Sequence, residues 1–365
     1  MSMRLKFSVA WLFVFIPITL ALEHFGVADP LLFFSAALAI VPIAHLIVHA
    51  TEQLATRTGD AIGGLLNATF GNAPELIIAF VALKAGLFDM VLGSIAGAIL
   101  ANLLLALGIA FLLGGLRHHD QDYNPVAARV YSSMMLIAVI SLAVPSAFSR
   151  FFAPEETIRQ EMLLNIGLAF VLLTAYVLYL VFMLKTHAGM FASRGSPDQA
   201  DDHGPHWSLP RAIGSLVGAS VLAAWMSEIL VGAAEGTGTA LGMSQLFIGI
   251  VFLAVVGGAA ESLSAIAMAR KNRVDMAVGI ALGSSIQIAL FVAPVLVLAS
   301  YFVAPRPLDL AFGRAEVGAL FIAVLIGSMV VSDGRSNWYK GVQLITVYAI
   351  IALMFYLMPD LATTG

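Results

Sequence analysis

The stretch "FGNAPELIIA", residues 70–79, combines two features that apolar helices ordinarily avoid. Glu75 is an ionisable side chain with apolar residues after it, and it follows the small-residue run Gly71-Asn72-Ala73-Pro74. Proline removes a backbone N–H and clashes with the preceding turn, so this run predicts a break in the helix. A carboxylate beside a helix break in an apolar segment indicates a functional site.

The composition around this stretch predicts a polytopic membrane protein. Hydrophobic residues make up 60% of the 365 residues and charged residues 11%, and the mean hydropathy is +0.96. A soluble domain has about 45–50% apolar and about 25% charged residues. The 18 Lys and Arg residues are scattered, so we expect membrane lipid and no nucleic acid as partner. The absence of Cys excludes disulfides and thiolate metal sites, and we expect no cofactor.

Eleven stretches are long and apolar enough to span a bilayer, which takes about 20 residues. They predict an all-α protein with about eleven transmembrane helices, at residues 8–27, 31–52, 59–85, 89–115, 126–149, 161–184, 209–234, 243–269, 274–303, 311–332 and 338–358. Of the 18 basic residues, 13 fall on the side of the N-terminus and 5 on the other. The positive-inside rule therefore predicts a multi-pass protein of the cell (inner) membrane, with the N-terminus cytoplasmic and the C-terminus outside.

The chain also contains an internal repeat. When the sequence is shifted by 186 residues, 11 of 43 positions are identical between 63–105 and 249–291, and Glu75 aligns with Glu261. An odd number of helices in each copy makes the second copy enter the membrane from the opposite side, an architecture of secondary transporters. We expect an N-terminal helix outside the repeats at residues 1–30 and two inverted-topology five-helix repeats at 31–186 and 209–358. A cytoplasmic linker, 187–208, joins the repeats, and a C-terminal tail follows at 359–365.

The two repeat carboxylates, Glu75 and Glu261, are both predicted near the middle of the bilayer. An ionised carboxylate there costs at least about 2.5 kcal/mol unless it faces a partner or a wet cavity. Each follows a turn of small residues that includes Gly71 or Gly257, and such breaks free backbone carbonyls that are tolerated only beside a cavity. Two carboxylates and free carbonyls make an all-oxygen site, which suits a hard cation such as Ca²⁺.

The same pair of carboxylates explains how cation and protons could exchange. A divalent cation cancels two ionised carboxylates, and two protons leave the empty site equally neutral, whereas the empty ionised site is costly. The two ions then compete for the same oxygens, which predicts a secondary antiporter rather than an enzyme. The alternative is a pair of Glu residues that only hydrogen-bonds two helices together.

Further polar residues in the predicted spans are candidates for the same site. We expect their amides and hydroxyls around the cation or a protonated Glu, the alternative being interhelical hydrogen bonds; they are Asn72, Asn102, Ser284, Ser285 and Gln287. Glu52 and Glu228 could be entry carboxylates at the two membrane faces, or ordinary interfacial residues. Two Gly-xxx-Gly pairs, Gly93/Gly97 and Gly279/Gly283, predict close helix packing.

Several motifs together resemble the cation/proton exchanger family of Ca²⁺/H⁺ antiporters, within the Ca²⁺/cation antiporter superfamily. They are "TGDAIGGLLNATFGNAPELIIAFVALKAG", "VVGGAAESLSAI", "GSSIQIALFVAP" and "SDGRSNWYKGVQLITVYAIIALMFYL", and the resemblance runs from about residue 31 to 358. It implies eleven helices, two inverted repeats and exchange of Ca²⁺ for H⁺ at a central site. It further implies Glu75 and Glu261 as ion-coupling residues, with Asn72, Ser284 and Gln287 as further site residues.

This chain departs from the family pattern at several of these positions. The second motif of the family usually reads Gly-Asn-Ala-Ala-Glu-His, but here Gly258 replaces the Asn and Ser262 replaces the His. Ala98 and Ala101 stand where the family often has Ser. The site therefore has fewer side-chain oxygens than the family pattern implies.

Other functions remain open from the sequence alone. A Na⁺- or K⁺-coupled cation exchanger could use the same scaffold, and a passive channel would not need competing carboxylates. An intramembrane enzyme would need a nucleophile with its base, or a His/Asp metal set, at membrane depth. The eight His residues lie at helix ends or in loops, except His45 and His49 in the predicted span 31–52, which have no apparent partner in the sequence. No oligomeric state follows from the sequence.

Overall fold

The computed structural model describes residues 8–58, 63, 65–66, 69–151, 158–191 and 207–358. These residues are almost entirely helical, as the composition predicts. The first half contains η1 (Val9–Val14), α1 (Phe15–His24), α2 (Asp29–Thr58), α4 (Ala73–Lys84), α5 (Phe88–Leu100), η2 (Ala101–Ala106), α6 (Leu107–His118), β1 (Asp120–Asp122), α7 (Pro125–Phe151), α8 (Ile158–Val181), η3 (Phe182–Thr186) and α9 (Ala188–Phe191).

The second half contains α10 (Leu209–Gly232), α11 (Ala234–Leu241), α12 (Gln245–Phe247), η4 (Ile248–Leu253), α13 (Ala254–Gly257), α14 (Ala259–Arg270), α15 (Val274–Gln287), η5 (Ile288–Val292), α16 (Ala293–Val303), α17 (Arg314–Val331), β2 (Arg335–Asn337) and α18 (Trp338–Leu357). The segments η2, η3, η4 and η5 are single π-helical stretches within longer helices. Such stretches occur frequently at functional sites.

Eight helical segments of the described chain are long and apolar enough to cross a membrane, and each overlaps a predicted span. They are Asp29–Arg57, Phe88–His118, Pro125–Phe148, Gln160–Thr186, Leu209–Leu241, Val274–Val303, Arg314–Val331 and Trp338–Leu357. The predicted span 243–269 is broken: Gln245–Gly257 and Ala259–Arg270 meet at an angle of 57°. The predicted first span is a shorter apolar helix, Val9–His24, and part of the predicted span 59–85 lies outside the described residues.

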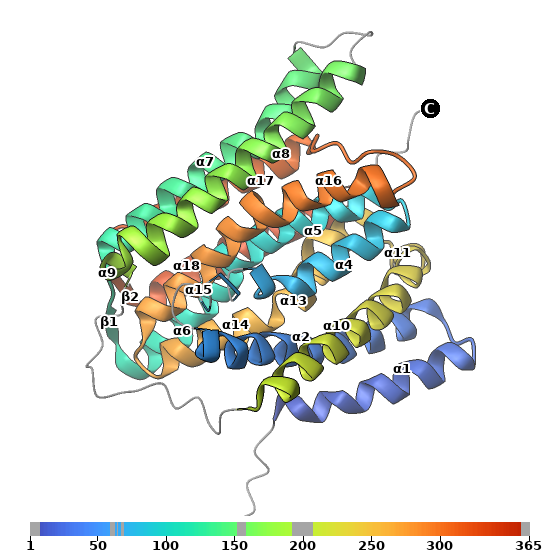
Figure 1. Ribbon diagram of the computed structural model, residues 1–365, viewed down its shortest axis with the longest axis horizontal. Coiled ribbons are helices and arrows are strands. Elements are labelled where there is room, and N and C mark those ends of the chain that lie inside the picture. Colours follow the sequence, from blue (N-terminus) through green and yellow to red (C-terminus); the bar gives the residue numbers. More distant parts are fainter. Residues whose placement is uncertain are drawn as a thin grey trace, which may run out of the picture.

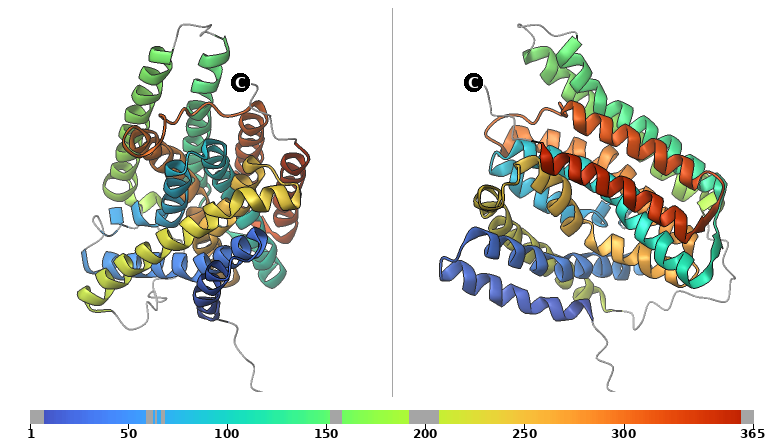
Figure 2. Two further views of the ribbon diagram at one scale, coloured as in Figure 1. Left: turned by 90° about the vertical axis from the view of Figure 1, so that its right-hand side faces the viewer. Right: turned by 180° about the vertical axis from the view of Figure 1, so that it is seen from behind.

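The helices form layers around a central group. α1 and α2 lie side by side with α10 packed along α2, and the long pair α7 and α8 lies on the opposite side of the molecule (Figure 1). The shorter helices α4, α5, α13, α14 and α15 lie between these layers (Figure 2). On one side α14 packs against α2, and on the other α15 packs against α7. The helix breaks therefore lie in the middle of the molecule.

Close backbone contact between α5 and η4 depends on glycines. A β-carbon at Gly93 would lie 2.8 Å from the carbonyl oxygen of Leu246, and one at Gly249 would lie 2.6 Å from that of Met90. The predicted packing role is thus confirmed for Gly93 and its partner Gly97, which faces the backbone of Ile250.

The same packing prediction is wrong for the second Gly-xxx-Gly pair. A β-carbon at Gly283 would have no atom within 4 Å, and one at Gly279 would meet only the Tyr131 hydroxyl at 3.6 Å. The physical reason is that this face of α15 borders a cavity instead of a neighbouring backbone.

A two-stranded antiparallel ladder joins the loops that precede α7 and α18. Its register pairs Asp120 with Asn337 and Asp122 with Arg335. Between the strands and α14, Gln121 is buried, and its Nε2 donates to Ala269 O and Asn272 Oδ1, each at 2.8 Å. The ladder and Gln121 thereby fix the end of α14, the helix that carries Glu261.

An ion pair stabilises the turn beside this ladder. Lys340 Nζ lies 2.6 and 2.7 Å from the two carboxylate oxygens of Asp333. Partial burial opposes ionisation of this carboxylate, but the hydrogen bonds from Lys340 and from the backbone N–H of Arg335 outweigh it and hold the pKa of Asp333 below its ordinary value.

Candidate functional site

Two helix starts position the repeat carboxylates. α4 begins at Ala73 and carries Glu75 in its first turn, while α14 begins at Ala259 and carries Glu261 in its first turn. Pro74 is tolerated because the first turn of a helix has no intrahelical acceptor for its N–H groups. The free N–H groups and the positive end of the helix dipole favour a negative charge at both places.

The two carboxyl-bearing turns are packed against each other. A β-carbon at Gly257 would lie 3.0 Å from Glu75 Cγ, so the glycine allows the turn before α14 to approach Glu75 closely. α14 begins two residues after Gly257 and carries Glu261 in its first turn, so the two acidic residues lie in neighbouring turns. Two such groups can share a divalent cation or bind protons, but both resist ionising without a cation.

Glu261 belongs to a hydrogen-bonded network of side chains from four helical segments. Ser284 Oγ contacts Glu261 Oε2, lies 2.7 Å from Asn72 Oδ1 and accepts from Asn102 Nδ2 at 3.0 Å. Asn72 Nδ2 in turn donates to Gln287 Oε1. Sequence analysis named all five residues, and the structure brings them together in one place.

The Ser284 hydroxyl allows two hydrogen-bonding patterns in this network. A hydroxyl has one proton and two lone pairs. In the first pattern, Ser284 accepts a hydrogen bond from Asn102 and donates one to Asn72. Its remaining lone pair accepts a hydrogen bond from Glu261, which must then be protonated. When Glu261 is ionised, Ser284 must donate to it, and the Asn72 and Gln287 amides must turn so that both present N–H groups. Both protonation states of Glu261 can therefore be satisfied.

Glu75 has a different environment. Its side chain is only 8% exposed, and neither carboxyl oxygen has a hydrogen-bond partner among the described residues. A buried polar group without a partner is costly, so this position is held for a reason other than stability. The two carboxyl groups of the site thus differ: one is bonded within a polar network and the other is not.

The two carboxyl groups also face different cavities. Glu261 lines a cavity of about 260 Å³, together with Gly71, Ser284 and Gln287. Glu52 lines the same cavity nearer the end of α2. Glu75 instead lines a cavity of about 10 Å³, room for about one water molecule.

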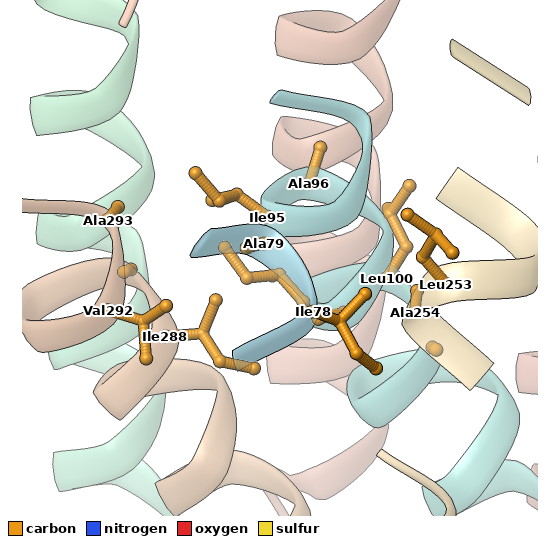
Figure 3. Close-up of a cluster of buried hydrophobic side chains, with 14 of the residues drawn as sticks. Ile78, Ala79, Ile95, Ala96, Leu100, Leu253, Ala254, Ile288, Val292 and Ala293 are labelled. Carbon is orange, nitrogen blue, oxygen red and sulfur yellow. The ribbon is translucent and has the colours of Figure 1, made fainter. Parts of the chain in front are cut away.

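An apolar plug closes the small cavity next to Glu75. The plug consists of Ile78, Ala79, Ile95, Leu253, Ile288 and Val292, and Figure 3 shows these side chains gathered between α4, α5, η4 and η5. The larger cavity instead carries carboxyl, hydroxyl and amide groups. Ions can therefore reach the site more readily from the Glu52 side than through the plug.

The two candidate entry carboxylates have different surroundings. The side chain of Glu52 is 48% exposed and its Oε2 lies 3.5 Å from His49 Nδ1. Glu228 borders a separate cavity and lies 3.7 Å from Lys84 Nζ. The lysine partly cancels the charge of Glu228, so the two residues are not equivalent as sites of cation attraction.

Other predicted residues lie beside the network without joining it. Ser285 is fully buried and its hydroxyl donates to the carbonyl of Ala281 in its own helix, 2.9 Å away, so it turns away from Glu261. Gly71 borders the larger cavity and Gly257 packs on Glu75.

Sequence analysis missed two tyrosines of the larger cavity. Tyr131 on α7 and Tyr179 on α8 line its wall. In the sequence they are only hydroxyl groups within apolar spans. Nothing in the sequence shows that they face α15 across the cavity, because that contact depends on the tertiary fold. It missed as well Glu316 on α17, which is 4% exposed and accepts from Gly313 N at 2.6 Å.

The donor set of the site is made of oxygen-bearing side chains. The described residues contain no cluster of three or more His, Cys, Asp and Glu side chains able to hold a metal. Two carboxyl groups, amides and one hydroxyl supply oxygen ligands, which hard cations such as Ca²⁺ prefer. A site with only two carboxyl groups can be neutralised by one divalent cation or by two protons.

Comparisons with known proteins agree with this chemistry. The model of the sodium/calcium exchanger protein family matches residues 29–185 and 211–357. The chain is 39% identical to a Ca²⁺/H⁺ antiporter of Synechocystis over 367 residues, covering 96% of this chain and 97% of the relative. It is 41% identical over 328 residues to the Ca²⁺/H⁺ antiporter ChaA of Bacillus subtilis, covering 90% and 92%.

A solved structure is similar over the same length. The structure of native YfkE is 36% identical and aligns with a TM-score of 0.81, covering 95% of this chain and 100% of the other. The sequence and structural similarities thus extend over nearly the whole molecule, including both helix breaks.

Proposed function

Because the chain belongs to the sodium/calcium exchanger protein family, we propose that it is a secondary active transporter that exchanges cytosolic Ca²⁺ for protons. The observation that carries this proposal is the pairing of Glu75 with Glu261 at two helix starts in the middle of the molecule. Relatives named Ca²⁺/H⁺ antiporter support Ca²⁺ and H⁺ as the transported substrates of this chain.

In the proposed cycle, Ca²⁺ and protons replace each other at the carboxyl groups. When Ca²⁺ binds, both carboxyl groups are ionised and the Ser284 hydroxyl donates a hydrogen bond to Glu261, with the Asn72 and Gln287 amides turned as described above. When Ca²⁺ leaves, protons restore neutrality and Glu261 donates to Ser284. Asn72, Asn102 and Gln287 orient the oxygens in both states, which assigns a role to each amide of the network.

Two inverted five-helix repeats form the proposed scaffold, with Val9–His24 outside them. The secondary structure supports this, because adding 186 to the bounds of α4 (Ala73–Lys84) gives those of α14 (Ala259–Arg270). The same shift places η2 (Ala101–Ala106) on η5 (Ile288–Val292) to within one residue. The family model also matches the chain in two segments that fall on the two proposed repeats.

We propose that the larger cavity opens to the cytoplasm and that the plug faces the outside. The excess of Lys and Arg on the N-terminal side supports this orientation in a cell membrane. Glu52 would then attract cytosolic cations at the mouth, and Glu228 would lie near the outer face, beside Lys84.

The test is ion flux in proteoliposomes with an imposed pH gradient. We expect the gradient to drive ⁴⁵Ca²⁺ movement in the parent protein and Glu75→Gln to abolish it, because Gln cannot exchange a proton. Glu23→Gln is the matched control: it makes the same change on α1 at an exposed position, and we expect unchanged flux.

The alternatives give different results in the same assay. Movement of Na⁺ or K⁺ without Ca²⁺ would assign a monovalent-coupled exchanger on this scaffold. Ca²⁺ flux that persists in Glu75→Gln and ignores the pH gradient would indicate a channel and reject the carboxylate mechanism. An intramembrane enzyme finds no support in the relatives, which are named antiporters.

A further inference from the structure

Trp207, just before α10, is held against the last turns of α2. Its backbone N–H donates to Gln53 Oε1 at 2.9 Å, and its carbonyl oxygen accepts from the Arg57 guanidinium. Because both hydrogen bonds use backbone groups of Trp207, they hold the residue in place whatever its side chain is. The indole ring is therefore available for other contacts.

The indole ring contacts one side chain from each of the two helices. The guanidinium carbon of Arg211 on α10 lies over the ring, 4.5 Å from its centroid. The imidazole of His49 on α2 meets the same ring edge to face, with 4.9 Å between the centroids and 85° between the planes. Both arrangements are favourable ones for an aromatic ring. The ring is thus fixed by Arg211, and it limits the orientations that His49 can adopt.

His49 connects this ring to a carboxylate of the larger cavity. His49 Nδ1 lies 3.5 Å from Glu52 Oε2, and residues three apart in a helix lie on the same face. Glu52 is 48% exposed, and an exposed Glu side chain has many rotamers unless a neighbour restricts it. Glu52 also lines the larger cavity. A series of contacts therefore runs from Arg211 through Trp207 and His49 to the carboxylate of Glu52.

We propose that Trp207 is a positioning residue for cation capture. Its ring holds His49 against Glu52, and His49 keeps the Glu52 carboxylate at the wall of the larger cavity. This inference rests on the proposed exchange function, in which Glu52 attracts cytosolic Ca²⁺. Trp207 acts only through Glu52, so its loss weakens the capture of Ca²⁺ without altering the exchange step at Glu75 and Glu261.

The first test is the initial rate of ⁴⁵Ca²⁺ uptake into proteoliposomes at one fixed pH. Trp207→Ala should raise the KM for Ca²⁺ about twofold at low salt and less at high salt, with kcat unchanged, because salt screens the attraction between charges. Trp207→Phe keeps an aromatic ring beside His49 and should behave as the parent. Trp225→Ala is the matched control, since it makes the same change on α10 at a position that is 46% exposed, and its KM should not change.

A double variant tests whether Trp207 acts through Glu52. The effects of two residues that act through one contact are not additive. The KM of Trp207→Ala combined with Glu52→Gln should therefore equal that of Glu52→Gln alone. Effects that multiply in the double variant, a KM of Trp207→Ala equal to that of the parent, or a lowered kcat in Trp207→Ala would each overturn the proposal.

A second measurement does not depend on transport. In protein labelled with ¹⁵N in its histidines alone, the Nδ1 resonance of His49 is identified by its loss in His49→Gln. This resonance should move in Trp207→Ala and in Glu52→Gln but not in Trp225→Ala, and an unmoved resonance in Trp207→Ala would overturn the proposal. If the resonance moves but the parent carries no Ca²⁺ under a pH gradient, the exchange function and the role in capture are both rejected, and only the contacts stand.

Discussion

Removal of the Ser284 hydroxyl should favour protons over Ca²⁺ at the site. The hydroxyl contacts Glu261 Oε2 and serves both of its protonation states. A hydrogen bond to an ionised group contributes about 1.5–3 kcal/mol and one between neutral groups about 0.5–1.5 kcal/mol. Ser284→Ala loses the stronger bond when Ca²⁺ is bound and the weaker one when Glu261 is protonated. The difference, about 1–1.5 kcal/mol, amounts to roughly 5–13-fold in the competition between the ions.

The assay is the initial rate of ⁴⁵Ca²⁺ uptake into proteoliposomes, measured against Ca²⁺ concentration at several fixed pH values. We expect the KM of Ser284→Ala to be raised about 5–13-fold at any pH where protons compete. Ser284→Thr keeps the hydroxyl and should behave as the parent.

Ser285→Ala supplies the matched control for this prediction. It removes a buried hydroxyl from the next residue, but that hydroxyl bonds only Ala281 O within its own helix. Its KM should stay within about twofold of the parent. Equal effects of the two alanine variants, or an unchanged KM in Ser284→Ala, would refute the assignment of Ser284 as the partner of Glu261.

Three further predictions follow from the cavities and the helix packing. Because the chain lacks Cys, an introduced cysteine is its only thiol. Ser264→Cys in the larger cavity should react with a membrane-impermeant thiol reagent added from the cytoplasmic side, whereas Ala98→Cys beside the plug should not. Labelling of both variants would show that the plug is open. Gly97→Ala should lower the melting temperature in detergent by several degrees, since overpacking costs about 1–3 kcal/mol. Gly283→Ala places its methyl group in open space and should leave the melting temperature unchanged. Equal melting temperatures of the two variants would contradict the packing account. Glu52→Gln should raise the KM for Ca²⁺ about two- to threefold at low salt and less at high salt, and an effect independent of salt would argue against attraction at the mouth.

The pattern of the sequence was sufficient to predict an almost entirely helical membrane protein and to single out polar residues that lie close together in the structure. Apolar length predicted the eight long apolar helices of the described residues, and four of the five predicted polar residues belong to the network around Glu261, whereas Ser285 turns away from it. Proline and glycine runs marked the helix breaks: a turn at Gly71 and Asn72 separates the helical residues 69–70 from α4, which begins at Ala73. These features depend on local chemistry, which neighbouring residues in the chain specify.

What the sequence left open depends on tertiary surroundings. A Gly-xxx-Gly pair indicates a smooth helix face but not what lies opposite, which is why Gly93 contacts a backbone while Gly283 borders a cavity. Ser284 and Ser285 are neighbours in sequence, and only the rotation of α15 decides which one reaches Glu261. The cavity wall formed by Tyr131 likewise comes from a helix remote in sequence.

The two carboxyl groups have different polar side chains around them, and this difference has a kinetic consequence. If the two proposed repeats were identical in sequence, the inward-open and outward-open forms would be related by a two-fold axis in the membrane plane and would have equal free energy. Ser284 contacts Glu261 and Gln287 lines the same cavity, while their counterparts in the first repeat are Ala98 and Ala101. The two forms cannot then bind Ca²⁺ equally well, because each exposes a differently equipped half of the site. Such a transporter runs at different speeds in its two directions under equal and opposite gradients.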